Sequence, residues 1–317
     1  MAEEILCDVI IVGGGPGGLC AGMYSSRANR DTICLEKYMP GGQIAITGEV
    51  EDYPGFEHIQ GAELAMKFTD HAKKFGLKIE MEEVEKVYCE GDYRVAKCAS
   101  GKIYKGKAMI VSTGGSPTYL KVPGEKEYSG RGVSYCAICD GAFFKEKVIA
   151  VVGGGDAAVE EAGYLTKFAS KVYIIHRRDK LRAQKIIQKR AFDNKKLGFV
   201  WDSVVESING DGTRVTDLTL KNVKTNETSK LDVSAVFVYI GFKPNTSMLP
   251  DDMKRDEGGY LVTNFHMETS IEGIYACGDV REQLVRQVTN AVGDGTTASV
   301  AAEKRLEMLE DKAAQRI

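Results

Sequence analysis

The chain has 317 residues, of which 43% are hydrophobic, and its formal net charge is -3. A chain of this length can bury a large core and favours two domains. The nearly neutral charge, without a strongly basic stretch, argues against nucleic-acid binding. The acidic N-terminus does not fit a signal peptide, and no apolar run approaches the roughly 20 residues of a membrane span. We therefore expect a cytoplasmic protein that binds neither nucleic acid nor membrane.

The first chemical signal is a glycine motif near the N-terminus. Residues 8–12 read as a buried parallel strand, followed by Gly13-x-Gly15-x-x-Gly18 and a helix. This pattern is typical of the phosphate-binding turn of a Rossmann unit, where glycines allow close approach to a pyrophosphate and the helix N-terminus attracts negative charge. The next strand ends in Glu36, a carboxylate placed to hold a ribose hydroxyl. Together these features predict a dinucleotide site.

Two thiols stand two residues apart at Cys136 and Cys139, with Asp140 directly after them. This spacing suits a disulfide that opens and closes, because one sulfur attacks as thiolate and the other resolves the mixed disulfide. Asp140 can act as general acid and base, or simply cap a helix. A zinc site is the alternative, but it needs two further ligands, and the chain has no second C-x-x-C and only scattered histidines. The remaining cysteines stand singly and are expected to pack as small apolar groups: Cys7, Cys20, Cys34, Cys89, Cys98 and Cys277.

The strand, glycine turn and helix recur at residues 147–159, with Gly153, Gly155 and Ala158 in the three motif positions. The chain therefore has two nucleotide-binding modules. Because the two modules share one pattern, the residues that end their second strands can be compared directly.

Glu36 lies twenty-three residues after Gly13, and the same interval from Gly153 reaches His176, which Arg177 and Arg178 follow. A carboxylate would repel a ribose 2′-phosphate, whereas guanidinium groups bind it through charge-assisted hydrogen bonds. Arg182 lies one helical turn beyond Arg178 and can join them; the alternative, a solvated basic run at a strand end, is disfavoured by the matched interval. The second module is thus predicted to choose NADPH over NADH.

Two different nucleotide sites imply two cofactors, and a hydride donor needs an acceptor that can pass electrons on to a disulfide. A flavin has that property. Residues 110–117 and 273–280 each read as a strand ending in a glycine turn, and the second offers Asp279 to a sugar or phosphate hydroxyl. We assign the flavin to the first module.

Taken together, the motifs resemble the low-molecular-weight thioredoxin reductases over nearly the whole chain. The motifs that carry the resemblance are Gly13 to Gly18, Gly41-Gly-Gln43, Cys136 to Asp140, Gly153 to Glu161, His176-Arg-Arg178, Cys277-Gly-Asp279 and Arg286-Gln287. The resemblance implies an α/β fold with two Rossmann-like dinucleotide-binding domains, in which the NADPH domain is inserted into a discontinuous FAD domain. We expect the FAD domain at residues 1–116 and 247–317, and the NADPH domain, with the redox-active pair, at 117–246. Glycines at the crossings, Gly114, Gly115 and Gly241, would serve as a hinge for domain rotation.

The resemblance also implies site residues. FAD contacts carry over to Gly13, Gly15, Pro16, Gly17, Glu36, Lys37, Gly41, Gly42, Gln43, Asp52, Thr113, Gly114, Asp279, Arg286, Gln287 and Val288. NADPH contacts carry over to Gly155, Asp156, Ala157, Glu160, His176, Arg177, Arg178 and Arg182. Three positions depart from the family pattern, namely Ile138, Ala157 and Asp52; the last puts a charge where relatives carry an amide near the flavin.

The mechanism that the resemblance implies runs from NADPH through FAD to the disulfide at Cys139, after which Cys136 attacks the disulfide of thioredoxin and Asp140 handles the proton. The loop Gly130–Gly132 is a candidate docking element, and a homodimer is expected. Two alternatives remain at this point. One is a flavin disulfide reductase that serves a glutaredoxin-like or peroxidase partner, and the other is a redox sensor without turnover.

Overall fold

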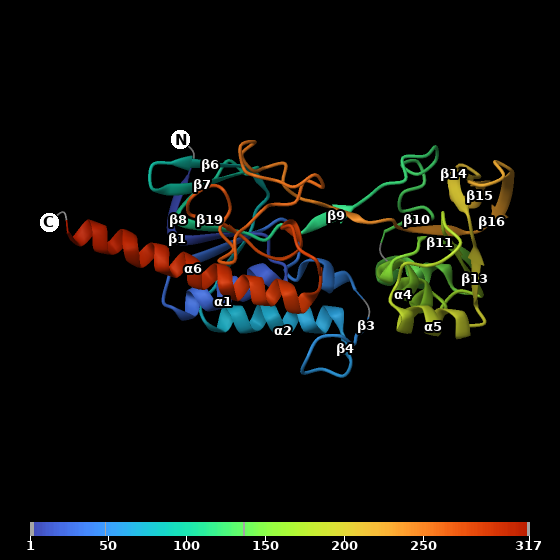
Figure 1. The fold of residues 1–317 in the computed structure, drawn as a ribbon, viewed down its shortest axis with the longest axis horizontal. Coiled ribbons are helices and arrows are strands. Elements are labelled where there is room, and N and C mark those ends of the chain that lie inside the picture. The colour runs from blue at the N-terminus through green and yellow to red at the C-terminus, as the bar shows by residue number, and fades with distance from the viewer. Residues whose placement is uncertain (1–2, 48, 136, 316–317) are drawn as a thin grey trace. The chain divides into compact units, whose positions relative to one another are not determined.

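The fold is described from a computed structural model that covers residues 3–47, 49–135 and 137–315. The chain divides into two compact units. Unit 1 comprises Met1–Ser116 and Lys243–Ile317, and unit 2 comprises Pro117–Phe242. Each unit is built around a sheet that contains parallel strands, and each has its own helices (Figure 1). These sheets agree with the expected α/β fold class with two Rossmann-like units.

Unit 1 contains the first glycine motif and both chain termini. Its elements are β1 (Glu4–Val12), α1 (Pro16–Arg27), β2 (Thr32–Glu36), the 3-10 helix η1 (Gly42–Ile46), β3 (Glu49–Val50), β4 (Ile59–Gln60), α2 (Gly61–Lys74), β5 (Lys78–Met81), β6 (Val84–Glu90), β7 (Tyr93–Cys98), β8 (Ile103–Val111), β19 (Ile274–Ala276), the 3-10 helix η3 (Gly278–Val280) and α6 (Val288–Ala314). The strand order is β5-β2-β1-β8-β7-β6, and β19 pairs with β8. The pairs β5–β2–β1–β8 and β8–β19 are parallel, whereas β8–β7–β6 is antiparallel.

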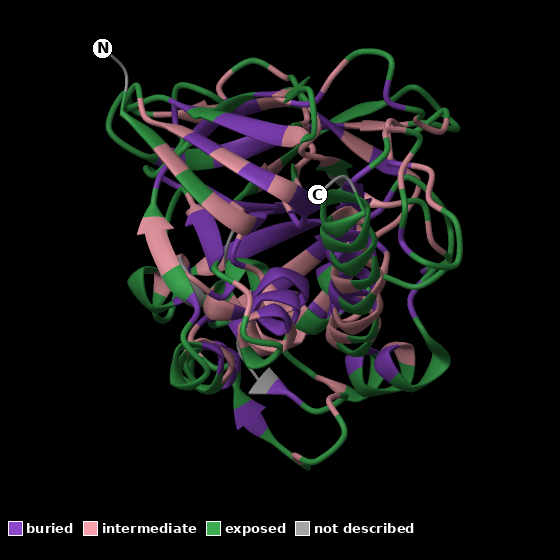
Figure 2. Ribbon diagram, turned by 90° about the vertical axis from the view of Figure 1, so that its left-hand side faces the viewer, coloured by how far each residue is buried: buried purple, intermediate pink, exposed green. Residues whose placement is uncertain are grey.

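The sheet of unit 1 is buried on both faces: successive residues of a strand point to opposite sides, and Val9 to Val12 of β1 are all buried. Ile10 and Val12 of β1 belong to one apolar cluster, and Val9 and Ile11 belong to another that includes residues of α6. Such continuous apolar strands are typical of parallel sheets with two covered faces. Figure 2 shows this pattern, with buried residues concentrated in the central strands and α1, and exposed residues along one side of α6.

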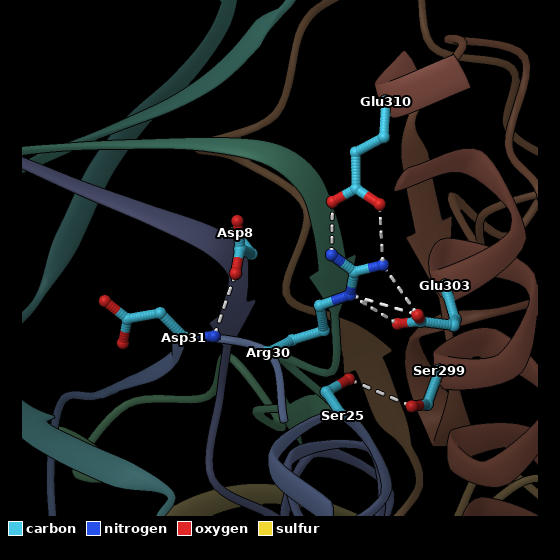
Figure 3. Close-up of polar contacts among 7 residues, drawn as sticks. All are labelled: Asp8, Ser25, Arg30, Asp31, Ser299, Glu303 and Glu310. Atoms are coloured by element: carbon cyan, nitrogen blue, oxygen red, sulfur yellow. Dashed lines mark hydrogen bonds and ion pairs between the residues drawn. The ribbon is translucent and has the colours of Figure 1, made fainter. Parts of the chain in front are cut away.

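Helix α6 is fastened to the end of α1 by polar contacts (Figure 3). Ser25 and Ser299 share a buried hydrogen bond of 2.9 Å, and Arg30 binds the carboxylates of Glu303 and Glu310. These two hydrogen-bonded carboxylates raise the pKa of Arg30. The contacts tie the C-terminal part of unit 1 to its N-terminal part, which lies on the other side of the insertion.

Unit 2 repeats the glycine-turn arrangement. Its elements are β10 (Val133–Ser134), α3 (Ala137–Asp140), the 3-10 helix η2 (Gly141–Phe144), β11 (Val148–Gly153), α4 (Asp156–Leu165), β12 (Lys171–Ile175), α5 (Lys185–Asp193), β13 (Leu197–Val200), β14 (Ser203–Gly210), β15 (Val215–Asn222), β16 (Thr228–Asp232) and β17 (Ala235–Tyr239). The parallel sheet runs β10-β17-β11-β12-β13, and β14-β15-β16 form a separate antiparallel sheet. Ile149 and Val151 pack with residues of α4 and α5, while Ala150 and Val152 pack with residues of the antiparallel sheet.

The chain passes from unit 1 to unit 2 and back through a short two-stranded sheet of β9 (Gly115–Pro117) and β18 (Phe242–Pro244). Just inside unit 2, the Thr118 amide donates to the Gly241 carbonyl at 2.8 Å. Just inside unit 1, the Asn245 amide donates to the Gly114 carbonyl at 2.9 Å. In each unit, the two places where the chain crosses to the other unit therefore lie side by side.

Among the residues that the structure describes, no helix is both long enough and apolar enough to cross a bilayer.

Candidate functional site

The first glycine turn joins β1 to α1 in unit 1. A β-carbon at Gly13 would stand 2.3 Å from the Ser112 carbonyl oxygen, and the residue has a φ of 100°, so only glycine fits there. At Gly15, by contrast, a β-carbon would meet no described heavy atom within 4 Å. Gly15 is the N-cap of α1, and Pro16 follows at the first helical position. The turn thus leaves open space directly in front of a helix N-terminus.

Glu36 reaches this turn from the end of β2. Its carboxylate accepts hydrogen bonds from the Gly14 amide at 2.6 Å and the Tyr38 amide at 2.8 Å. The interval of twenty-three residues in the sequence therefore brings the acid onto the glycine turn. The neighbouring Lys37 instead pairs with Glu83 at 2.6 Å on the exposed surface.

A second glycine pair closes against the same turn. The Gly41 amide donates to the Gly14 carbonyl at 2.8 Å, and Gly42 has a φ of 57°. A β-carbon at Gly42 would stand 3.0 Å from the α-carbon of Gly15. The segment Gly41-Gly-Gln43 therefore lies beside the open space at Gly15, and the Gln43 side chain is exposed there. Asp52 is also exposed.

The segment Cys277-Gly-Asp279 packs against the first turn of α1 from the far end of the sequence. A β-carbon at Gly17 would lie 3.1 Å from the Cys277 sulfur. Burial raises the pKa of Asp279, and the guanidinium of Arg286 works against that rise. The Arg286 guanidinium itself stacks 4.0 Å above the ring of Tyr260. Gln287 is the N-cap of α6 and Val288 its first residue.

Two residues that support this segment were not expected from the sequence. Asp294, which is buried in α6, accepts from the Gly278 amide at 3.1 Å and from Arg281 at 3.1 Å. Arg281 in turn donates to the hydroxyl of Thr263 at 3.0 Å. A charged residue between Gly293 and Gly295 of a helix was the only signal in the sequence that could have pointed to this contact.

Thr113 and Gly114 lie where unit 1 meets β9. The Thr113 hydroxyl donates to the Asn245 carbonyl at 2.7 Å, and the Asn245 side-chain amide donates back to the Thr113 carbonyl at 2.9 Å. Gly114 has a φ of 58°, which favours glycine. Asn245 thus fixes the end of β8 and was not singled out in the sequence.

The second glycine turn joins β11 to α4 in unit 2 and repeats the steric pattern of the first. A β-carbon at Gly153 would stand 2.4 Å from the Tyr239 carbonyl oxygen and 2.6 Å from the β-carbon of Ala158. At Gly155, the N-cap of α4, a β-carbon would again meet no described heavy atom within 4 Å. Ala157 and Glu160 are exposed on the helix that follows.

His176 occupies the position that Glu36 has in the first module, but it is arranged differently. The imidazole is buried beneath the turn, since a β-carbon at Gly154 would stand 2.4 Å from its ring. Burial lowers the pKa of His176, and the cationic Arg182 and Arg178 lower it further. Its Nε2 atom is buried and has no hydrogen-bond partner among the described residues. A neutral imidazole thus underlies the turn.

The arginines that follow point their charges to solvent. Arg177, Arg178 and Arg182 are exposed, while the Arg182 amide donates to the Gly154 carbonyl at 2.7 Å. The structure therefore brings the three guanidinium groups to one loop that is attached to the glycine turn. Both carboxylate oxygens of Asp156 are taken by Gln184, at 2.6 Å and 3.3 Å.

The structure describes only part of the predicted redox pair. Cys136 lies outside the described residues, as does the side chain of Cys139. The backbone of residues 137–140 forms α3, in which Asp140 is half-buried. Helix α3 belongs to unit 2, the unit with the second glycine turn.

Tyr239 contacts the residue directly after Cys136 and was missed in the sequence. The Ala137 amide donates to the Tyr239 hydroxyl at 2.7 Å, and Ala137 is buried. Burial raises the pKa of Tyr239, with a further rise from the charge of Glu161. Burial also raises the pKa of Glu161 to about 7, and Glu160 adds to that rise. The sequence gives no signal for this role of Tyr239, because the residue ends an ordinary apolar strand.

The single cysteines are mostly buried, as expected. Cys20, Cys34, Cys98 and Cys277 are buried, and burial raises the pKa of Cys98 and Cys277 to about 12. Such thiols are poor nucleophiles. The expectation is wrong for Cys89, which is exposed because it faces outward near the end of β6.

Comparisons with known proteins agree with this arrangement. Residues 7–295 match the pyridine nucleotide-disulphide oxidoreductase family. The chain is 49% identical to the thioredoxin reductase of Bacillus subtilis (strain 168), over 98% of both chains. Its structure is similar to that of Lactococcus lactis thioredoxin reductase in the FR conformation, with a TM-score of 0.93 and 45% identity over 95% of this chain and 99% of that one. T. acidophilum thioredoxin reductase gives a TM-score of 0.90 at 34% identity, over 96% of this chain and 99% of that one.

Proposed function

The chain belongs to the thioredoxin reductase family of the pyridine nucleotide-disulphide oxidoreductases, and on that premise we propose that it reduces the disulfide of thioredoxin with NADPH, through FAD and the Cys136/Cys139 pair. The observation that carries the proposal is the contrast between two glycine turns with the same steric pattern. One has a carboxylate at the turn, and the other has a loop of three arginines. The two modules therefore differ in the ligand that each can hold.

The first turn fits FAD. Open space at Gly15 admits a pyrophosphate in front of α1, and Glu36 lies at the turn as an acceptor for a ribose hydroxyl. Only a glycine at position 42 leaves room beside Gly15, because a β-carbon there would stand 3.0 Å from the Gly15 α-carbon, and Gly42 would line the same space. Asp279 and Arg286, at the start of the segment that leads into α6, would hold the remaining polar groups of the cofactor. Unit 1 is on these grounds the FAD domain.

The second turn fits NADPH. Open space at Gly155 admits its pyrophosphate, and the exposed guanidinium groups of Arg177, Arg178 and Arg182 would bind the ribose 2′-phosphate. His176 belongs to the same predicted set and supports the turn from beneath, with its Nε2 buried and without a partner among the described residues. Unit 2 is on these grounds the NADPH domain.

The chemistry toward the protein substrate belongs to the cysteine pair. When both cofactors are bound, NADPH would supply two electrons and FAD would pass them on, which would keep the pair as a dithiol. The thiolate of Cys136 attacks one sulfur of the substrate disulfide, and the other substrate sulfur leaves as a thiolate. Cys139 then attacks Cys136, closing the Cys136–Cys139 disulfide and releasing the second substrate thiolate. Asp140 supplies a proton to a departing thiolate.

A pocket in unit 2 offers a place for the substrate protein. Its lining includes Asp140 together with Arg131, Phe143 and Arg214. Phe143 is 79% exposed and offers an apolar side chain beside these two arginines. The pocket supports docking of a protein whose surface beside its disulfide is apolar and partly acidic.

Two further points complete the proposal. We place the protein in the cytoplasm, supported by its six single cysteines, all of which are free. We also propose a homodimer, supported by apolar residues such as Val300 and Met308 on the exposed side of α6. Light scattering of the purified protein tests the second point.

The function is tested with the purified protein and a panel of thioredoxins. We expect a yellow protein that oxidises NADPH in the presence of thioredoxin, and that uses NADH at least tenfold less well. Cys136→Ser should abolish turnover, with Cys20→Ser as control because Cys20 is buried elsewhere. Turnover that survives in Cys136→Ser would exclude the cysteine mechanism. A wild-type protein that reduces a glutaredoxin or a peroxidase but no thioredoxin would reassign the substrate.

A further inference from the structure

The loop between β12 and α5 is held to the second glycine turn by a contact between two helix N-termini. Asp156 is the first residue of α4, and Gln184 is the N-cap of α5. One carboxylate oxygen of Asp156 accepts from the Gln184 main-chain amide at 2.6 Å, and the other accepts from the Gln184 side-chain amide at 3.3 Å. A carboxylate at this position is stabilised by both helix N-termini.

The loop is also pinned through its backbone and its apolar residues. Leu181 and Ala183 are 6% and 4% exposed and belong to the apolar core between the sheet and helices α4 and α5. The amides of Arg182 and Ala183 both donate to the Gly154 carbonyl, at 2.7 Å and 3.1 Å. Arg182 stands between the two buried residues, so its own side chain must point outward.

A further tether comes from the body of α5. The Gln188 side-chain amide donates to the Ala183 carbonyl at 2.6 Å. At the other end of the loop, the Asp202 amide donates to the Arg178 carbonyl at 3.2 Å. The backbone that carries Arg178 and Arg182 is therefore fixed on both sides before any nucleotide binds.

We propose that Asp156 and Gln184 form a clamp that sets the selectivity for NADPH over NADH by fixing the loop of Arg177, Arg178 and Arg182. Neither clamp residue needs to touch the 2′-phosphate. Asp156 and Gln184 are positioning residues, and their role lies in keeping the guanidinium groups ordered at the glycine turn. This inference rests on the use of NADPH proposed above.

The clamp and simple electrostatics predict opposite outcomes for Asp156. If the carboxylate acted only through its charge, its removal would strengthen the binding of a phosphate, because like charges repel. If Asp156 instead contacted the nucleotide directly, its removal would weaken the binding of nucleotides with and without a 2′-phosphate alike. The clamp alone predicts a loss that is confined to the 2′-phosphate.

The experiment measures binding of adenosine 2′,5′-bisphosphate and of 5′-AMP to the FAD-loaded protein by calorimetry. Asp156→Ala should raise the Kd for the bisphosphate about three- to tenfold, the usual effect of one or two hydrogen bonds. The Kd for 5′-AMP should change less than twofold. Asp156→Asn is neutral as well but keeps an oxygen for the Gln184 amide, so it should retain most of the selectivity.

Two controls complete the design. Asp193→Ala removes the same charge at the exposed C-terminal end of α5 and should leave both Kd values unchanged. Hydrogen exchange of the nucleotide-free protein gives a readout without ligand. The amides of Arg182 and Ala183 should exchange about three- to tenfold faster in Asp156→Ala than in the wild type.

The clamp is wrong if Asp156→Ala binds the bisphosphate as tightly as the wild type does, or if it loses affinity for both nucleotides equally. This outcome differs from failure of the proposed function. If the wild type itself does not prefer the bisphosphate to 5′-AMP, the assignment of NADPH to unit 2 fails, whatever the variants do.

Discussion

The two glycine turns have the same steric pattern but differ in the side chains that lie against them. In unit 1 the residue at the end of the second strand, Glu36, is hydrogen-bonded to the turn amide. In unit 2 the equivalent residue, His176, is buried beneath the turn and the next residues carry exposed guanidinium groups. A glycine turn at a helix N-terminus suits a pyrophosphate in either unit. If the proposed function holds, the choice of nucleotide is made by the few residues after the second strand of each module.

The largest effect is expected from adding a methyl group to a closed glycine, by which we mean a glycine whose added β-carbon would clash with a neighbouring atom. An open glycine has free space at that place. Gly153→Ala places a carbon 2.4 Å from the Tyr239 carbonyl oxygen, and should lower the free energy of unfolding by about 3 kcal/mol. Gly155→Ala meets open space and should leave it within about 1 kcal/mol while weakening NADPH binding. Chemical denaturation and NADPH titration of both variants check this pair. Equal loss of stability in the two would contradict the division into closed and open glycines.

The next effect concerns the arginines alone. The double variant Arg177→Ala, Arg178→Ala removes two exposed cations from the loop at the second turn. We expect its KM for NADPH to rise ten- to a hundredfold, because a hydrogen bond to a charged group contributes about 1.5–3 kcal/mol. Its KM for NADH should change less than twofold. Steady-state kinetics with both donors measure the ratio, and a parallel rise in both values would mean that the arginines do not read the 2′-phosphate.

A smaller effect is expected at Tyr239. Its hydrogen bond with Ala137 belongs to unit 2, and no similar contact is described above for unit 1. Tyr239→Phe removes the acceptor of the Ala137 amide and should lower kcat with thioredoxin two- to tenfold, since one hydrogen bond contributes about 0.5–1.5 kcal/mol. The KM for NADPH should not change. Tyr173→Phe, in β12 of the same sheet, serves as the matched control. An unchanged kcat in Tyr239→Phe would show that this contact has no part in the exchange chemistry.

The smallest effect depends on pH. In the two helices that follow the turns, Glu161 of α4 corresponds to the buried Ala21 of α1. The pKa of Glu161 is raised from 4.5 to about 7, so above pH 7 the folded protein carries a destabilising charge. This cost is relieved as the pH falls from 7 toward 4.5, because the folded state then binds a proton that the unfolded state does not.

Glu161→Gln should therefore stabilise the protein by about 1 kcal/mol at pH 8, and the gain should shrink toward pH 5. Urea unfolding at the two pH values measures the difference. A gain that is the same at both would mean that the ionisation of Glu161 does not affect stability.

Much of the fold could be predicted because its signals are local in the sequence. The strand, glycine turn and helix of each module occupy consecutive residues, and the interval from Gly13 to Glu36 does bring the two parts together. The fold class is confirmed. The α6 helix shows where local reasoning stops. In the sequence an amphipathic pattern is evident only from Ala298 to Ala314, whereas the helix begins at Val288.

The early part of α6 was missed because glycines are poor helix formers in isolation. Gly295 is required there by a contact distant in sequence, since a β-carbon at this position would stand 2.2 Å from the Gly17 carbonyl oxygen of α1. The roles of Asp294 and Tyr239 could not be predicted from the sequence for a similar reason. Each acts through a partner more than a dozen residues away, and neither belongs to a local motif.

The short sheet of β9 and β18 has a consequence for how such a chain can arise. Because unit 2 leaves and re-enters unit 1 through adjacent strands, the gap in unit 1 could be closed by a single tight turn, and unit 2 could stand as a separate gene product. The entropy of holding two chain ends together grows only slowly with the length between them. Inserting one module into a surface loop of another therefore costs little free energy, provided that the inserted module has its two ends close together.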